Sequence, residues 1–565
     1  MKIYRVSLRR KACVLTALVL LSPLLLPSPG VAQGTTAAIL GVVTDQDGAV
    51  LAGARITARN NLTNLSRSII TDIAGRFRID ELPLGEYEVQ AEHPRFRKEI
   101  RTGVLLTVGR DAVVNFNLKV GAVTHEVTVI GDAPAVDTTT SEISGLVSSR
   151  TISELPLNGR DLFQLALLEP GVVDVGGLVK SPIDAGAGTV KMAIDGGRIT
   201  FNSFLFDGAS VNEAENTTPG SAAGGFTGVD AVQEFQLITH NYSAEFGGAG
   251  GGIINLVSKS GTNDFHGSAF EFLRNSALDA RNFFDQQSVP PFRRNQFGGS
   301  LGGPLRKDRT FLFVAYEGLR QELAQTERFF VPDDSSRLTA SAAAAPYVNL
   351  YPQANAGEAG GGLAVFIRDQ TGQTNEDYFT ARADHNFSSR DTMFARYTFD
   401  NSSDVAPDHV ISNTILDGRN QYTGLSETHL FSPRFIQVAR FAYDRSKIFG
   451  DLRDVVPIPQ SLVWVPGQSV LGVFGNVGGL SPLSDRTIVP RFLILNNFEG
   501  SEQIDFTRGP HSMKFGGLVR GIQLNAVSTT IAAGEYIFGS YDAFLNAQPE
   551  IFAAEVRAGF RSLRS

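Results

Sequence analysis

The sequence is poor in three residue types that often anchor a fold or an active site: it has one cysteine, one tryptophan and four methionines among 565 residues. The cysteine, Cys13, lies in an N-terminal apolar stretch that we predict is removed on export, so the mature chain would contain no thiol. Disulfides, cysteine zinc sites and cysteine nucleophiles are therefore excluded. A net charge of −8 and the absence of a basic tract argue against nucleic-acid binding.

Long apolar runs are missing after the first thirty residues, which predicts no transmembrane helix beyond that point. The N-terminus itself has basic residues, then an apolar core from Ala12 to Leu26, then the small residues Gly30-Val31-Ala32. This order is typical of a secretory signal peptide, and we predict that residues 1–32 are cleaved. Cys13 precedes most of the apolar core, so it is not a lipoprotein anchor.

Catalytic and metal-binding motifs are also missing, and we predict no enzyme activity, no cofactor and no metal site. A Gly-x-Ser-x-Gly pattern like that of a nucleophile elbow occurs at Gly298-Gly299-Ser300-Leu301-Gly302. However, Gly303-Pro304 stands where the helix of that motif must begin. His125-Glu126 and Asp408-His409 are isolated pairs that we expect to be solvated. The histidines show no metal-ligand spacing; they are His93, His125, His240, His266, His385, His409, His429 and His511.

Residues 36–120 contain short β-prone runs separated by turns every eight to twelve residues, which predicts an antiparallel sandwich of about seven strands. Asp45-Gln46-Asp47-Gly48 lacks the later ligands of a calcium loop, so we expect a hairpin turn there. The region resembles the carboxypeptidase regulatory-like domain, a transthyretin-like accessory module without peptidase chemistry, in its segments GVVTDQDG, ARITA, TDIAGRF and LGEYEV. Aromatic candidates for sugar stacking or for core packing are Phe77, Tyr87, Phe96 and Phe116.

The stretch from Val229 to Gly261 organises the rest of the chain. An alternating apolar segment precedes the glycine run 247–252, and the β-branched strand Ile253–Val257 follows it directly. Glycines at this density before a strand indicate backbone that passes close to other backbone, or that bends where a side chain would clash. GGAGGGIINLVSKSG resembles the end of the plug domain of TonB-dependent outer-membrane receptors. AVQEFQL stands where an Arg-Gly-Pro turn is common in that family, and this departure resembles the Oar-like branch.

The resemblance extends over residues 125–259 and implies an α/β plug domain. LPLNGRDLFQLALLEPGV is similar to the Oar-like plug, with a helix from Asp161 to Leu168 that Asn158 is expected to cap. Met192–Arg198 and Asn202–Gly208 each read as a strand entering a tight turn. The strand between sandwich and plug is similar to a TonB box, the segment gripped by the inner-membrane energy transducer; its residues are Glu126, Val127, Thr128, Val129 and Ile130. A last strand of the sandwich, or a plain linker, is the alternative.

Residues 262–565 predict part of an outer-membrane β-barrel. One face of each strand is apolar: Met393, Ala395, Tyr397 and Phe399 alternate with polar neighbours. Short turns alternate with long loops, expected near 274–294, 321–376, 401–420 and 445–492 and after 525, as in barrels that cross the outer membrane. The nine expected strands are Thr262–Leu273, Asn295–Leu301, Thr310–Arg320, Asp377–Phe387, Asp391–Asp400, Gln421–Phe431, Arg434–Asp444, Leu493–Thr507 and His511–Leu524.

Two features of this region fit a complete barrel less well. Tyrosine and tryptophan are scarce, so the expected interfacial aromatics are Phe283, Phe284, Phe311, Phe313 and Phe538. Nine strands are also too few for a barrel of roughly 22 that surrounds a plug, and an open edge is not tolerated in lipid. The sequence ends at Arg564-Ser565 without a terminal aromatic. We therefore expect a truncated chain, with about ten further strands beyond residue 565.

Together these patterns predict a mainly β protein of the outer membrane, with sandwich and plug on the periplasmic side. The resemblance implies a receptor that takes up a glycan, peptide or chelate by energy-coupled transport, with TonB, membrane lipid and an extracellular substrate, carbohydrate among the candidates, as partners. The alternatives are a non-transporting surface or protein-export component of the same architecture, and a soluble periplasmic carbohydrate-binding protein.

Overall fold

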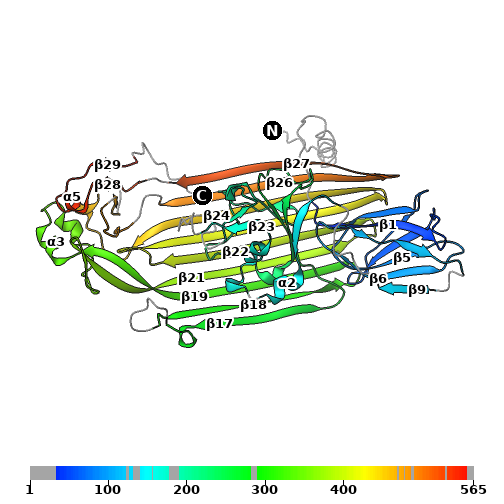
Figure 1. The fold of residues 1–565 in the computed structure, drawn as a ribbon, viewed down its shortest axis with the longest axis horizontal. Coiled ribbons are helices and arrows are strands. Elements are labelled where there is room, and N and C mark those ends of the chain that lie inside the picture. The colour runs from blue at the N-terminus through cyan, green and yellow to red at the C-terminus, as the bar shows by residue number, and fades with distance from the viewer. Residues whose placement is uncertain are drawn as a thin grey trace, which may run out of the picture.

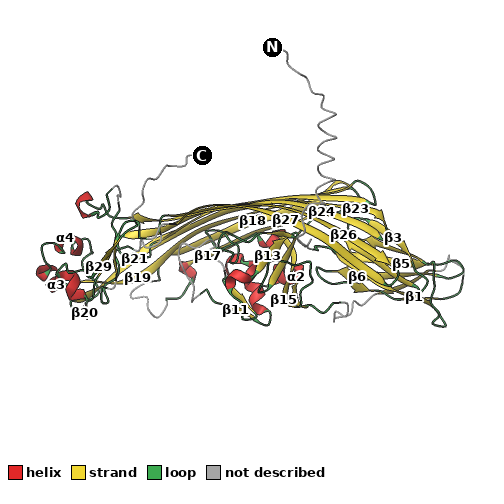
Figure 2. Cartoon of the chain, turned by 90° about the horizontal axis from the view of Figure 1, so that it is seen from above, coloured by secondary structure: helices red, strands yellow, loops and turns green. Residues whose placement is uncertain are grey.

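The computed structural model describes residues 34–555 except 122–125, 131–139, 156, 177–189, 282–288, 467–469, 476, 485–488 and 529–530. A curved wall of long strands holds a smaller unit on its concave side, and a β-sandwich lies at one end of the wall (Figure 1). Figure 2 shows the smaller unit beneath the arched wall. The predicted signal peptide and Cys13 lie outside the described residues.

The sandwich consists of two facing sheets. In the first, the strand order is β4-β1-β7, and β8 also pairs with β1. In the second, the strand order is β3-β2-β5-β6-β9. The prediction of about seven antiparallel strands was wrong in one respect, because β7 and β8 pair with β1 in parallel and β9 pairs with β6 in parallel. The strands are β1 (Ala37–Asp45), β2 (Arg55–Asn60), β3 (Ser66–Ile70), β4 (Arg76–Leu82), β5 (Gly85–Glu92), β6 (Lys98–Leu106), β7 (Ala112–Val113), β8 (Phe116–Leu118) and β9 (Glu126–Ile130).

The apolar faces of these strands form one core. Phe77, Tyr87 and Phe116 are buried in it, so these three rings pack inside the sandwich and are not presented to a sugar. Phe96 is partly buried and contacts His93 edge-on. The Asp45 carboxylate accepts hydrogen bonds from the backbone N–H of Asp47 and Ala49, at 2.9 and 2.8 Å, which confirms the hairpin turn.

The unit on the concave side of the wall, residues 143–258, is called the inner unit here. Its main sheet has the order β10-β15-β16-β13-β14, and β11 pairs with β12. Asp161, rather than Asn158, caps the predicted helix by accepting from Phe163 N–H at 3.0 Å, and that helix is 3₁₀. The elements are β10 (Ile143–Val147), α2 (Ser149–Glu154), 3₁₀ turns at Asn158–Arg160, Leu162–Leu168, Ile199–Phe201 and Val229–Ala231, β11 (Val172–Asp174), β12 (Met192–Ile194), β13 (Ser203–Phe206), β14 (Ala209–Ser210), β15 (Val232–His240) and β16 (Ile253–Ser258).

The glycine run is where the chain passes tightly against the inner unit. A Cβ atom on Gly251 would lie 2.4 Å from the Asn202 side-chain oxygen, and one on Gly252 would lie 2.5 Å from Ile194. Neither distance is tolerated by real side chains, so glycine is required for β16 to insert beside β13 and β15. The atoms that leave no room are side-chain atoms, so of the two predicted reasons for the glycines, the clash of an added side chain is the one confirmed at Gly251 and Gly252.

The wall is an antiparallel sheet with the order β17-β18-β19-β21-β22-β23-β24-β26-β27, and the short β20 adds to β21. All nine predicted strands are present, and most are longer than predicted. No helix among the described residues is long and apolar enough to cross a bilayer. The strands are β17 (His266–Asn275), β18 (Phe292–Arg306), β19 (Thr310–Pro332), β20 (Glu358–Gly360), β21 (Leu363–Asn386), β22 (Asp391–Ala406), β23 (Ser412–Ser432), β24 (Phe435–Asp454), β26 (Arg491–Arg508) and β27 (His511–Ser528).

Side chains alternate between the two faces of the wall as predicted. On β22, Arg396, Thr398 and Asp400 are buried against the inner unit, whereas Ala395 and Tyr397 are exposed on the convex face. The predicted interfacial phenylalanines were wrong where they can be tested: Phe311 and Phe313 point inward and are buried, and Phe538 is buried among the external loops. Phe283 and Phe284 lie outside the described residues.

Long connections gather at the end of the wall far from the sandwich, and short turns at the sandwich end (Figure 1). The predicted loop ranges were too wide, because β19, β21, β23 and β24 continue into them. The connections pack around one apolar core, which we call the outer unit; its centre includes Tyr347, Tyr351, Phe474, Phe538 and Phe544. Its elements are α3 (Asp334–Thr339), α4 (Ala345–Val348), a 3₁₀ turn (Gln460–Leu462), β25 (Val473–Gly475), β28 (Glu535–Ile537), α5 (Tyr541–Leu545) and β29 (Ile551–Ala553).

Candidate functional site

The inner unit presents a carboxylate to the wall at the turn between β13 and β14. Asp207 has φ 52° and Gly208 has φ 81°, so both residues are in the left-handed region and the chain reverses in a tight turn. The Asp-Gly sequence predicts such a turn. Ser258 on β16 fixes the Asp207 side chain by donating its backbone N–H and its hydroxyl, at 2.9 and 2.7 Å. The carboxylate is therefore held in one orientation before it meets the wall.

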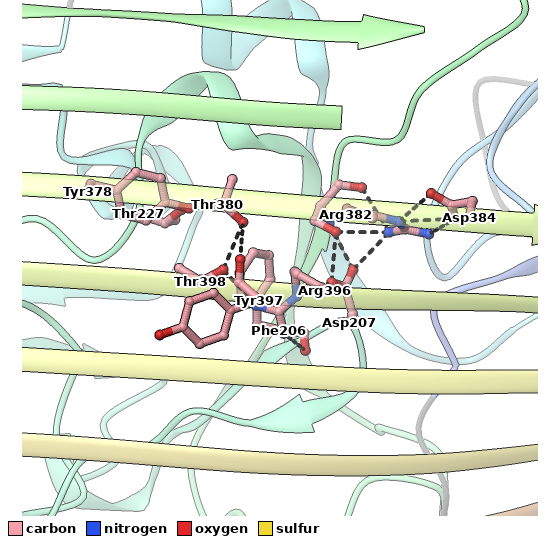
Figure 3. Close-up of polar contacts among 11 residues, drawn as sticks. Phe206, Asp207, Thr227, Tyr378, Thr380, Arg382, Asp384, Arg396, Tyr397 and Thr398 are labelled. Carbon is pink, nitrogen blue, oxygen red and sulfur yellow. Dashed lines mark hydrogen bonds and ion pairs between the residues drawn. The ribbon is translucent and has the colours of Figure 1, made fainter. Parts of the chain in front are cut away.

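Two arginines of the wall meet this carboxylate (Figure 3). Arg396 Nε lies 2.7 Å from Asp207 Oδ2, and Arg382 Nη1 lies 3.4 Å from Oδ1. The Arg396 side chain is 0% exposed and that of Asp207 is 2% exposed, so the ion pair is removed from water. Arg396 also lies over the Phe206 ring, 3.6 Å from its centroid, and Arg382 is shared with Asp384 at 2.9 Å. We call Asp207, Arg382 and Arg396 the wall lock.

Further polar links join the segment 220–227 of the inner unit to three neighbouring strands of the wall. The Thr227 hydroxyl donates to the Tyr378 hydroxyl at 2.6 Å. Ala222 N–H donates to the Ser402 hydroxyl at 2.9 Å, and the Asn420 amide donates to the Gly220 carbonyl at 3.0 Å. These links lie on β21, β22 and β23, so this segment is fixed across the concave face.

Arg160 forms a second charged contact nearer the β17 edge of the wall. Its guanidinium bonds to Glu317 on β19 and to Asp230 of the inner unit, each at 3.0 Å, and it lies 4.0 Å from the centroid of the Phe270 ring. Near the opposite edge, Lys514 on β27 pairs with Glu245 at 2.9 Å. The inner unit is thus tied to both edges and to the middle of the wall by charged or hydrogen-bonded groups.

Such an interface can hold the inner unit in one position and also release it. Directional polar contacts fix the position of the inner unit. When the interface opens, each polar group can form a hydrogen bond with water instead, whereas a continuous apolar interface would expose its whole area to water. Pairs that are buried together are stable only while both partners stay in place. The inner unit is therefore held against the wall by contacts that each depend on a partner from the other side.

The sandwich contacts the inner unit through Glu234 on β15, whose carboxylate accepts the N–H of Val108 at 2.5 Å. Burial raises the pKa of Glu234 to about 7, and this hydrogen bond and Arg110 only partly oppose the rise. The folded carboxyl thus binds its proton more tightly than the unfolded one. Its contribution to stability is full below the unfolded pKa and is lost as the pH rises toward 7.

We expect the Glu234→Gln variant to lose this pH dependence. Between pH 5 and 8 the unmodified chain should lose on the order of 2–3 kcal/mol that the variant keeps, since one pKa unit corresponds to about 1.4 kcal/mol. Thermal unfolding in detergent across this pH range measures the difference. Glu154→Gln, at an exposed carboxylate of α2, is the matched control and should follow the unmodified chain. Parallel pH profiles for Glu234→Gln and the unmodified chain would contradict the assignment.

The predicted partner-binding residues Glu126, Val127, Thr128, Val129 and Ile130 form β9. They pair in parallel with Lys98–Thr102 of β6. This is the arrangement of the alternative, a last strand of the sandwich. β9 ends its sheet, and in the described part of the chain no strand pairs with its other edge. A role in partner binding stays a prediction.

Sequence spacing missed one group with metal-ligand chemistry. Asp391, Glu427 and His429 each offer a ligand atom, and these atoms lie within 4.8 Å of one another on the convex face of β22 and β23. The His429 ring bonds directly to Asp391, which accounts for the pair without an ion. Of the two pairs that the sequence predicts to be solvated, Asp408-His409 is bonded at 2.7 Å and partly buried, and His125 of the pair His125-Glu126 lies outside the described residues. Gly298–Gly302 lies inside β18, so no elbow forms.

Comparison with known proteins gives matches along most of the chain. Residues 257–340 and 334–554 match the outer membrane beta barrel domain family, and residues 38–119 match the carboxypeptidase regulatory-like domain family. The TonB-dependent transporter Oar of Myxococcus xanthus is 29% identical over 320 residues, which are 53% of this chain and 28% of that protein. The chain thus spans less than a third of this curated relative.

Similar solved structures include an outer membrane transporter and a siderophore receptor. The transporter YddB from Escherichia coli has 14% identity and a TM-score of 0.46, covering 71% of this chain and 50% of that one. The siderophore receptor PirA from Acinetobacter baumannii has 16% identity and a TM-score of 0.41, covering 69% and 49%. Since the family match extends over more than half of the sequence, the chain belongs to the outer membrane β-barrel family, is a homologue of the transporter Oar, and is a protein of the outer membrane.

Proposed function

We propose that the chain is the N-terminal part of a TonB-dependent receptor, in which the inner unit is the plug of a larger barrel. The domains would be a sandwich at 36–120, a plug at 125–259 with the box-like strand 126–130, and barrel wall from 262 onward. The wall lock supports this most directly: a separate globule fills the concave side of the wall and is pinned to it by a buried ion pair between Asp207 and Arg396. Further strands would close the cylinder, because an unpaired edge is not stable in lipid.

Transport through such a barrel needs energy from elsewhere. No nucleotide is available at the outer membrane, so the plug must be displaced by a periplasmic partner that draws on the inner membrane. An edge strand is a suitable handle, since a partner strand can add to its free edge through backbone hydrogen bonds. β9 offers such an edge, and it precedes the inner unit in the sequence. In this proposal the sandwich positions β9 for a TonB-type transducer.

The substrate would bind the outer unit and the external side of the plug. A compact core with aromatic side chains gives the external connections a fixed shape. Glycans, peptides and iron chelates are all compatible with this surface. The sandwich supports no sugar site at Phe77, Tyr87 or Phe116, because these rings are in its core.

Uptake tests the proposal in cells that express the whole gene product. Fluorescent maltoheptaose, a fluorescent decapeptide and a catecholate iron chelate serve as probes. We expect at least one to accumulate in the periplasm, and a protonophore to stop accumulation while surface binding persists. Accumulation that is insensitive to the protonophore would contradict TonB coupling. Surface binding of a probe without uptake would favour the second candidate, a surface or export component, which the compact outer unit also supports.

A further inference from the structure

The convex face of the wall carries aromatic side chains at the level where the external loops begin. Tyr397 on β22 and Tyr443 on β24 lie in one row, since both pair with Thr423 of β23. The Tyr397 hydroxyl accepts from the Gln421 amide at 2.8 Å, and the Tyr443 hydroxyl donates to the Asn496 amide oxygen at 3.0 Å. Tyrosines with an apolar ring and a bonded hydroxyl are typical of the membrane–water interface.

Below this row, toward the sandwich, the convex face is apolar. Ala383, Ala395, Leu425, Phe441 and Val519 lie in register there on β21, β22, β23, β24 and β27, with Gly500 of β26 between the last two. Three of them, Leu425, Phe441 and Val519, are large and exposed. Lipid chains would cover this band, so the tyrosine row marks its boundary on the side of the long loops.

Three cations follow immediately outside the tyrosine row. Arg445 is two residues from Tyr443, and Lys447 two residues further along β24; Arg419 on β23 pairs directly with Lys447. One such step is about 7 Å along a strand. All three point outward, because their neighbours Asn420 and Ile448 contact the inner unit from the other face. We call Arg419, Arg445 and Lys447 the basic patch.

The charge of the basic patch is not neutralised by the protein. Among the described residues, none of the three forms an ion pair with a carboxylate. Arg419 donates to the neutral Asn401 oxygen at 3.1 and 3.2 Å, Arg445 donates to Asn496 at 2.7 Å, and Lys447 lies 5.8 Å from the Phe492 ring centroid. Asp417, one step further out on β23, lies beyond ion-pair distance of all three. Like charges directly across a strand pair are destabilising unless an anion lies between them.

A contrasting site on the same face has its charge balanced. Arg320 on β19 also points outward, but it donates to both carboxylate oxygens of Asp377 on β21, at 2.8 and 3.0 Å. The wall therefore pairs one outward arginine with an acid and leaves three neighbouring cations without one.

We propose that the basic patch binds the phosphate groups of a lipid headgroup in the outer leaflet. Guanidinium and ammonium groups are the side chains that recognise phosphate, and long basic side chains at a membrane boundary reach to the headgroup level. The two arginines and the lysine lie on adjacent strands at that level. This proposal depends on the placement of the wall in the membrane and not on transport.

Lipid retention tests the proposal in the whole gene product purified in detergent. After incubation with vesicles of phosphatidylcholine containing diphosphorylated lipid A, the unmodified protein should retain lipid A, measured as glucosamine per chain because phosphatidylcholine also contains phosphorus. The triple variant Arg419→Gln, Arg445→Gln, Lys447→Gln should retain at least about tenfold less lipid A. Arg320→Gln, the matched control, should retain as much as the unmodified protein. Single variants should each lower retention to an intermediate level, which provides a readout if the triple variant does not fold.

The proposal is overturned if the folded triple variant retains as much lipid A as the unmodified protein, or if all single variants do. Displacement of lipid A by millimolar inorganic phosphate would also overturn it, because the site would then be one for a free anion. Retention of phosphatidylcholine equal to that of lipid A would show simple chain packing without headgroup recognition.

Discussion

The Asp207→Asn variant is expected to loosen the inner unit by about 3–5 kcal/mol, because it leaves a buried arginine without its counter-charge. The replacement keeps the shape of the side chain and removes only the charge. Arg396 is fully buried and has no other carboxylate within ion-pair distance among the described residues. Amide hydrogen exchange of β13 and β16 measures the effect, and protection should fall by about 10²- to 10⁴-fold if exchange follows opening of the inner unit.

Two comparisons separate this effect from a general loss of stability. Arg150→Ala removes a pair with Glu154 in which the side chains are 83% and 60% exposed, and exchange should not change. Combining Asp207→Asn with Arg396→Met should cost less than the sum of the two single changes, because no unpaired charge then remains at that position. Unchanged exchange in Asp207→Asn would show that the wall lock does not hold the inner unit.

The alternation of apolar and polar residues was enough to predict the wall. It located all nine strands, and it places Arg396 on the face of β22 opposite to Ala395 and Tyr397, because every second side chain shares a face. The strand ends were missed where the alternation of apolar and polar residues stops. The segments 321–332 and 363–376 read as loop, yet they pair with each other as the outer halves of β19 and β21. Residues 321–328 and 368–376 are mostly polar, whereas 329–331 and 363–367 are apolar on both faces because they enter the core of the outer unit. Neither pattern has the two-residue period of a half-buried strand.

The sequence predicts the two sides of the wall lock separately, but it does not predict that they are in contact. The turn at Asp207-Gly208 and the inward direction of Arg396 are local properties, and both were visible. Their meeting depends on how the inner unit sits in the wall, and nothing near either residue in the sequence specifies that. The group of Asp391, Glu427 and His429 was missed for a related reason, because its members meet across a strand pair and not along one strand. The parallel addition of β9 to β6 likewise joins distant segments.

Deletion of residues 126–130 is expected to abolish binding of the periplasmic domain of a TonB-type transducer. A pentapeptide edge strand contributes its affinity through backbone hydrogen bonds, so removing it removes the binding surface as a whole rather than one contact. Affinity measured by calorimetry should fall by at least about 100-fold. Deleting residues 133–137 shortens the chain equally and leaves β9 intact, so it should bind normally. Comparison of the two deletions distinguishes the loss of β9 itself from the effect of shortening the chain between the sandwich and the inner unit.

A single thiol gives an independent and sharper measurement. The predicted mature chain has no cysteine, so Thr128→Cys would introduce a unique thiol in the middle of β9. It should form a mixed disulfide with a cysteine in the transducer's added strand, whereas Thr63→Cys on the sandwich, far from β9 in its sheets, should not. Because β9 is already paired with β6 along one edge, a transducer must either use the free edge or displace β9 from the sandwich. Increased exchange of the β6 amides on complex formation would indicate displacement, and unchanged exchange would indicate addition. Equal cross-linking at both positions would falsify the role of β9 as the handle of the plug.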